Sequence, residues 1–167
     1  MHEKNFAHLD IKLNNILLDD LFNVWIGDFG SAIHCETKRF RMKRKRGTQN
    51  YMAPEVRDLS QGKSYDPKKA DVYSLGVCLF VLLFKQFPTL NTNVRPTTSN
   101  EATSVPNPFT VFNEKWYKVS IEVWRLLLKM LEQDPRKWPT MNEVCGCDWI
   151  LDYQSCELQV YETMCKL

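Results

Sequence analysis

Apolar residues in the first part of the chain form two short runs, at 16–18 and 24–26, on either side of the segment 19–23. Short apolar runs around a segment that contains Asp and Asn are typical of a strand, a turn and a second strand. The turn lacks glycine and contains Leu21 and Phe22 instead. We expect these two side chains to pack on a neighbour or to mark weak local order.

The second half of the chain has helical patterns. Beginning at Asp71, the sequence is almost entirely apolar as far as Phe84, and a helix without a polar stripe belongs in the centre of a fold. Apolar spacing predicts another helix over 121–131, and Thr140 to Glu143 has the form of a capping box that opens one more. These elements predict a mainly α protein with one small β-hairpin, an α+β fold.

Composition agrees with a folded intracellular domain. The 167 residues are 44% hydrophobic, enough for one core, and the apolar run 75–84 is shorter than the roughly 20 residues that cross a bilayer. Six cysteines are scattered, and the pair Cys145 and Cys147 has no second pair at zinc-site spacing. We therefore expect reduced thiols, no membrane association and a cytoplasmic protein.

Three segments carry candidate chemistry. They are His8-Leu-Asp-Ile-Lys-Leu-Asn-Asn15, Asp28-Phe-Gly30, and Gly47-Thr-Gln-Asn-Tyr-Met-Ala-Pro-Glu55. In this order and at these separations they resemble the C-terminal lobe of eukaryotic protein kinases of the serine/threonine type. The resemblance covers residues 1–150, with a polar insertion at about 88–113, and leaves 151–167 as a C-terminal tail.

The resemblance implies roles for the polar residues of the first and third segments. Asp10 would accept the proton of the incoming hydroxyl, and Lys12 would lie near the γ-phosphate as a compact charge. Thr48 would hydrogen-bond toward both of them. Lys12 and the pair Gly47-Thr48 favour serine and threonine hydroxyls as acceptors.

The resemblance also implies ATP and Mg²⁺ as cofactors. Asn15, which completes the catalytic set, and Asp28 would be the magnesium ligands, because Mg²⁺ prefers carboxylate and carbonyl oxygens. Lys12 would contact the nucleotide phosphates, and the adenine ring would rest on Leu17. The expected function is ATP-dependent phosphoryl transfer to proteins.

A protein kinase also has a smaller N-terminal lobe, with a Gly-rich loop and a strand Lys, and we expect this lobe to be absent from the chain. Alone, the chain would then bind ATP feebly, transfer phosphate weakly or not at all, and leave an inter-lobe face open to a partner. A non-catalytic, pseudokinase-like binding module is the alternative function.

Three positions need separate comment. Leu9 replaces the Arg that commonly pairs with a phosphorylated activation loop, so we expect phosphorylation at Thr37 not to switch the protein.

Trp138 stands where the kinase family usually has an Arg, which pairs with the Glu that matches Glu55. Arg136 or Lys137 then reaches Glu55, or its carboxylate is solvated, or the segment is loosened. Asp71 either accepts hydrogen bonds from the backbone of the catalytic loop, or caps its own helix, or both.

The run 38–46 holds seven of the chain's Lys and Arg residues, whereas the whole chain has a net charge of +2. Three interpretations stay open: a solvated basic loop, a preference for acidic substrates or an acidic regulatory partner, and nuclear targeting or nucleic-acid contact. The resemblance gives a protein substrate as the main partner and argues against nucleic acid.

Overall fold

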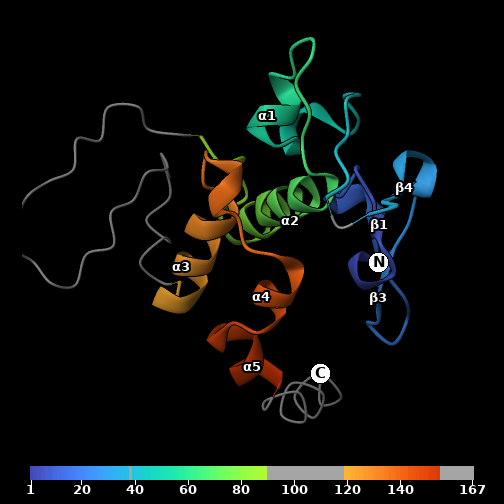
Figure 1. Cartoon of the computed structure of the whole chain (residues 1–167). Helices are drawn as coiled ribbons and strands as arrows, with labels where there is room; N and C mark the ends of the chain where they lie inside the picture. Colours follow the sequence, from blue (N-terminus) through green and yellow to red (C-terminus); the bar gives the residue numbers. More distant parts are fainter. Residues whose placement is uncertain (38, 90–118, 155–167) are drawn as a thin grey trace, which may run out of the picture.

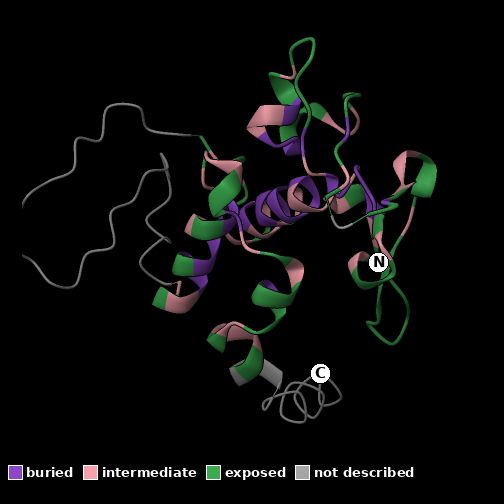
Figure 2. Cartoon of the chain, in the orientation of Figure 1, coloured by how far each residue is buried: buried purple, intermediate pink, exposed green. Residues whose placement is uncertain are grey.

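The longest helix, α2 (Pro67–Phe84), crosses the middle of the molecule, and most of its residues are buried (Figures 1 and 2). The computed structural model describes residues 1–37, 39–89 and 119–154. The predicted insertion at about 88–113 falls almost entirely outside this part of the chain, as does most of the predicted tail. The other α-helices are α1 (Pro54–Arg57), α3 (Ile121–Met130), α4 (Met141–Cys145) and α5 (Asp148–Gln154).

The mainly α architecture with a small hairpin is confirmed. In the described residues the strands form two antiparallel pairs, β1 (Phe6–Ala7) with β4 (Ile33–His34), and β2 (Ile16–Leu18) with β3 (Val24–Ile26). Short 3₁₀ turns connect these elements, at His2–Lys4, Leu13–Asn15, Phe29–Ser31, Gln49–Tyr51 and Pro135–Lys137. None of the helices in the described part of the chain has the length and apolar character needed to cross a membrane.

Helix α2 begins earlier than the sequence pattern predicted. Asp66 is its N-cap, and the Asp66 side chain accepts hydrogen bonds from the amides of Lys68 and Lys69, which lack intrahelical partners. Pro67 occupies the first helical position, where a missing amide proton costs nothing. The alternative that Asp71 caps this helix is therefore wrong.

The core lies where α2 meets α3. A side chain at Gly76 would come within 2.8 Å of Met130 Cβ, so the glycine allows the two helices to approach closely. Phe84 packs against Trp124 of α3, with ring centroids 6.0 Å apart. The predicted capping box is confirmed, because Thr140 and Glu143 exchange hydrogen bonds at the start of α4. Helix α5 continues past residue 150, so the predicted domain boundary stays a prediction.

The hairpin turn owes its shape to Asp19. Its carboxylate accepts hydrogen bonds from the Leu21 and Asn23 amides, the Asn23 side chain and the Trp25 indole. These bonds, chiefly from Asn23, lower the pKa of Asp19 to about 2. Leu21 and Phe22 are 66% and 62% exposed, so the expectation that they pack on a neighbour is wrong.

Candidate active site

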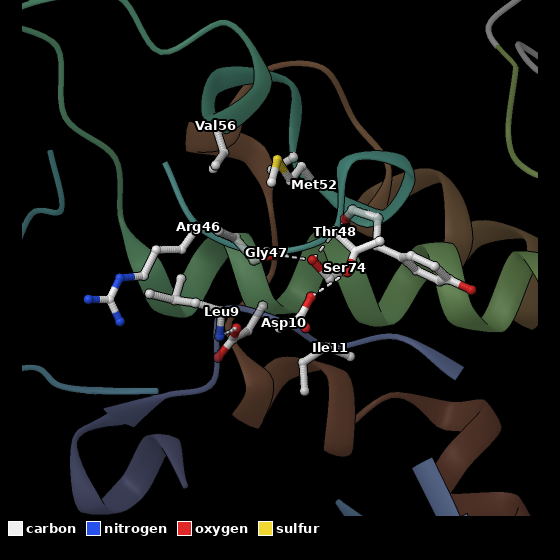
Figure 3. A pocket seen from close by; sticks show the side chains of 13 residues that line it. Leu9, Asp10, Ile11, Arg46, Gly47, Thr48, Met52, Val56 and Ser74 are labelled. Atoms are coloured by element: carbon white, nitrogen blue, oxygen red, sulfur yellow. Dashed lines mark hydrogen bonds between the residues drawn. The ribbon is translucent and has the colours of Figure 1, made fainter. Parts of the chain in front are cut away.

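Asp10, Lys12 and Thr48 form a closed hydrogen-bonded cluster. The Thr48 hydroxyl donates to Asp10 Oδ1 at 2.7 Å, and the Lys12 ammonium donates to Asp10 Oδ2 at 2.8 Å and to Thr48 Oγ1 at 3.0 Å. Figure 3 shows Asp10 and Thr48 facing each other from two separate segments that pass α2. The contacts expected of Thr48 are thus confirmed.

The cluster controls the charge of its members. Partial burial opposes ionisation of Asp10, but hydrogen bonds from Lys12 and Thr48 outweigh it and lower the pKa of Asp10. The hydrogen bond to Asp10 raises the pKa of Lys12, and the charge of Asp28 contributes in the same direction. At neutral pH the site therefore holds an ionised carboxylate beside an ammonium group.

Asp71 holds the segment that carries Asp10. Its Oδ2 accepts from the His8 amide and its Oδ1 from the Leu9 amide, both at 2.7 Å, and it is only 3% exposed. The expected hydrogen bonds from the backbone of this segment to Asp71 are therefore confirmed. Sequence reasoning missed His2, whose Nε2 lies 2.9 Å from Asp71 Oδ2, because 69 positions separate the two residues and neither belongs to a motif with the other.

The backbone of this segment is in an unfavourable conformation. Leu9 has φ 64°, a left-handed geometry that costs a residue with a Cβ about 1–3 kcal/mol and persists only where the surrounding contacts offset this cost. Gly47 packs directly over Leu9. Its φ is 105°, and a Cβ there would lie 2.5 Å from the Leu9 carbonyl oxygen. Only glycine permits this approach, which brings Thr48 to Asp10 (Figure 3).

The hairpin brings the two predicted magnesium ligands to the same end. The Gly27 amide donates to the Asn15 carbonyl at 2.8 Å, just beyond the ladder that pairs Ile16 with Ile26. Asn15 Nδ2 donates to the Asp10 carbonyl at 2.8 Å, which leaves its Oδ1 to serve as a ligand. Asp28 follows Gly27 and is exposed.

His8 connects this end of the hairpin to the segment that carries Asp10. Its ring nitrogens lie 3.0 Å from the Gly27 carbonyl oxygen and 3.2 Å from the Asp10 amide, and its ring packs on Phe29. His8 is fully enclosed. It thereby couples the position of Asp10 to that of Asp28.

The donor set suits Mg²⁺. In the described residues no group of three or more His, Cys, Asp or Glu side chains is arranged to hold a metal. Mg²⁺ does not require such a cage, since it commonly takes one or two protein oxygens and completes its shell with water and phosphate. Leu17, predicted to support the adenine ring, lies on β2 and is 53% exposed.

Glu55 differs from all these groups. Both of its carboxylate oxygens are enclosed and find no hydrogen-bond partner among the described residues. Burial raises the pKa of Glu55 to about 7. Arg136 pairs with Asp134 and Lys137 with Glu132, so the expectation that one of them reaches Glu55 is wrong, as is the expectation of a solvated carboxylate.

Trp138 occupies the place where a cation was expected. It is 1% exposed and packs on Tyr73, with ring centroids 5.2 Å apart. Its indole nitrogen donates to the Glu132 carbonyl, and its own carbonyl accepts from Lys69. The tryptophan is thus well accommodated and offers no charge to Glu55.

Comparison with known proteins gives matches over most of the chain. A model of the protein kinase domain matches residues 1–150. The chain is 35% identical over 145 residues to a probable serine/threonine-protein kinase CCRP1 of Zea mays, covering 86% of this chain and 22% of the relative. It is 37% identical over 154 residues to the serine/threonine-protein kinase polo of Drosophila melanogaster, covering 90% of this chain and 24% of the relative.

A third relative has similar coverage. The chain is 35% identical over 150 residues to the CBL-interacting protein kinase 3 of Oryza sativa subsp. japonica, which includes 89% of this chain and 32% of the relative. The chain therefore spans between a fifth and a third of the length of these three curated relatives.

Proposed function

Because the chain belongs to the protein kinase family, we propose that it transfers the γ-phosphoryl group of ATP to Ser or Thr hydroxyls of protein substrates, and that residues 1–150 correspond to the C-terminal lobe of a kinase. The observation that carries this proposal is the cluster of Asp10, Lys12 and Thr48. Phosphoryl transfer depends on positioning and charge stabilisation more than on covalent chemistry, and the cluster supplies both.

In this proposal Asp10 accepts a hydrogen bond from the substrate hydroxyl and takes its proton as the phosphoryl group moves. The lowered pKa of Asp10 keeps it ionised and ready to accept. Thr48 and Lys12 hold its two oxygens in fixed directions, so the incoming oxygen is oriented before reaction. Lys12 also places a positive charge where the phosphate oxygens gain negative charge.

Asn15 and Asp28 would hold Mg²⁺ through the Asn15 Oδ1 and Asp28 carboxylate oxygens. A bound magnesium ion neutralises charge on the nucleotide phosphates. His8 keeps the Gly27 carbonyl close to the Asp10 amide, which fixes the spacing between metal ligands and base. Leu17 would support the adenine ring from one side. Its exposure leads us to expect weak nucleotide affinity for the chain alone.

Transfer of labelled phosphate from Mg-ATP to a mixture of Ser/Thr-containing proteins tests the proposal. We expect only weak transfer by the chain alone, and Asp10→Asn should reduce it by about a hundredfold or more, because general-base catalysis contributes roughly 10²–10⁴-fold. The matched control is Asp58→Asn, which changes an exposed carboxylate outside the cluster. Equal rates for the Asp10→Asn variant and the unaltered chain would contradict the assigned role.

Glu55, which has no hydrogen-bond partner among the described residues, favours a second function, a binding module without catalysis, because a buried carboxylate without a partner weakens the segment that follows Thr48. Thermal shift with and without Mg-ATP, combined with the transfer assay, separates the two. Stabilisation without phosphoryl transfer supports the binding module. Strong stabilisation would also contradict our expectation of weak nucleotide affinity.

A partner surface also belongs to this proposal. An open apolar cavity of about 300 Å³ lies beside the Asp71 network. Its lining includes side chains from the hairpin and from α2 and α4: Ile16, Ile26, Leu75 and Met141. Apolar surface left open in this way is typical of an interaction site, and we propose that this is part of the inter-lobe face expected from the sequence.

A further inference from the structure

The segment 38–46 combines strong positive charge with little internal compensation. Among its described residues the structure contains one ion pair, between Arg41 and Asp66 at 3.3 Å. Arg39, Lys43 and Arg44 are exposed and form no ion pair with any described residue. These three positive charges are therefore exposed to solvent and have no acidic partner among the described residues.

The last two cations of the run hold backbone in place. Lys45 donates to the Arg57 carbonyl at 2.9 Å, and Arg46 donates to the Ser31 carbonyl at 3.1 Å. In Figure 3 the Arg46 side chain extends away from Asp10 and Thr48. These neutral acceptors leave the positive charges uncancelled, so Lys45 and Arg46 add to the field of the segment while serving a structural purpose.

The segment is also anchored at Met42 and Arg44, and at Gly47 just beyond its last residue. Tyr65, which is buried, pairs with Met42 through two backbone hydrogen bonds of 2.9 and 3.0 Å, and its hydroxyl donates to the Arg44 carbonyl at 2.9 Å. Gly47 packs on Leu9 at the other end. Three residues span at most about 11 Å, so Arg44 stays close to Gly47 and hence to Thr48 and Asp10.

We propose that Arg39, Lys43 and Arg44 form a docking surface for acidic segments of protein substrates. The inference rests on the proposed function, because it assigns a substrate class to that site. An anchored cationic surface next to a catalytic carboxylate raises the local concentration of acidic partners. A peptide with Asp or Glu near its Ser or Thr fits this surface, since it brings compensating charge to the three exposed cations.

Binding is the first test, because it does not depend on catalysis. Fluorescence anisotropy with the 167-residue chain would compare labelled peptides that share one central Ser and carry four Glu, four Gln or four Lys around it. We expect the Glu peptide to bind about tenfold more tightly than the Gln peptide at low salt, from several exposed ion pairs. The preference should shrink as salt is raised.

Charge reversal provides the matched comparison. Lys43→Glu combined with Arg44→Glu should abolish the preference for the Glu peptide and create one for the Lys peptide. Arg125→Glu combined with Lys129→Glu makes the same change of total charge on the exposed face of α3 and should leave the preference intact. Equal losses in the two double variants would overturn the proposal, since net charge alone would then explain binding.

Two further outcomes decide the remaining alternatives. Equal affinity for the Glu and Gln peptides would leave 38–46 as a solvated loop. Tighter binding of a single-stranded RNA with the same charge as the Glu peptide, with a steep salt dependence, would replace the proposal by nucleic-acid contact. Binding of the Glu peptide without phosphate transfer would contradict the proposed catalytic function and leave the docking surface standing.

Discussion

Two buried carboxylates differ in their hydrogen-bond partners. Asp71 accepts two backbone hydrogen bonds of 2.7 Å, with His2 as a third neighbour. Glu55 has no partner for either oxygen among the described residues. Burial of a charge is costly unless it is paired and hydrogen-bonded. Asp71 therefore fixes the geometry of the segment that carries Asp10, whereas protonation of Glu55 affects the stability of the segment after Thr48.

The largest effect is expected from Asp71→Asn. The amide loses the charge and turns one acceptor into a donor that faces the His8 or Leu9 amide. Hydrogen bonds to a charged group are each worth about 1.5–3 kcal/mol, so we expect unfolding to become easier by about 3 kcal/mol in urea titration. Asp58→Asn, at an exposed position, should change the free energy of unfolding little, and equal effects of the two substitutions would contradict the role given to Asp71.

Glu55→Gln should give the next largest effect, with the opposite sign. The folded-state pKa of Glu55, about 7, exceeds its ordinary value of 4.5, so the folded chain holds this proton more tightly than the unfolded chain. Stability then falls as pH rises from 4.5 to 7 and stays low above 7. The shift corresponds to about 3 kcal/mol, and solvent screening reduces our expectation to about 2 kcal/mol.

Urea titrations at about pH 5 and pH 8, on either side of the raised pKa, measure this effect. The difference in unfolding free energy between the two pH values should be larger in the unaltered chain than in Glu55→Gln, and the variant should be the more stable protein at the higher pH. If both proteins show the same pH dependence, the Glu55 carboxylate is satisfied by a group beyond the described residues.

Trp138→Arg would give the Glu55 carboxylate a charged partner, so that both buried carboxylates, Asp71 and Glu55, would be paired. The substitution removes a buried aromatic ring that packs on Tyr73, so alone it should destabilise the chain. Combined with Glu55→Gln in a double-mutant cycle at about pH 8, it should reveal a favourable coupling of about 1 kcal/mol between the introduced guanidinium group and the Glu55 carboxylate. No coupling would mean that the cation does not reach the carboxylate.

The smallest effect is expected at Thr37. Leu9 follows the Asp71-bound His8 but carries no charge, so a phosphate on Thr37 finds no partner there. Thr37→Ala and Thr37→Glu should each change phosphoryl-transfer activity by less than about twofold, since exposed charges contribute little on their own. A large change in the Glu variant alone would show that another cation replaces the missing Arg.

The regular elements could be predicted because their signals are local. The strands at 16–18 and 24–26, the helix ending near 131 and the capping box at Thr140 each depend on residues within a few positions of one another. The start of α2 was predicted too late, although Asp66-Pro67 carries both a cap and a first-turn signal. The apolar run that begins at Asp71 obscured this earlier signal.

The site could be predicted only as far as its motifs reach. Asp10, Lys12 and Thr48 form the expected hydrogen bonds. That Glu55 has no partner among the described residues depends on which carboxylates Arg136 and Lys137 pair with. Both pair with acidic residues close in sequence. The spacing of residues in the sequence does not predict these ion pairs, because the partners of exposed side chains depend on the folded backbone. The exposure of the hairpin turn was also not predicted, because the shape of the turn depends on the hydrogen bonds that the Asp19 carboxylate accepts.

The Asp71 bonds also have a consequence for the order of folding. They join amides and carboxylate across 63 and 62 positions, and such distant contacts form slowly because a long loop must close first. Until α2 docks, nothing holds Leu9 in its left-handed conformation. Helical content should therefore return early during refolding, while the catalytic segment acquires its shape in one of the last steps.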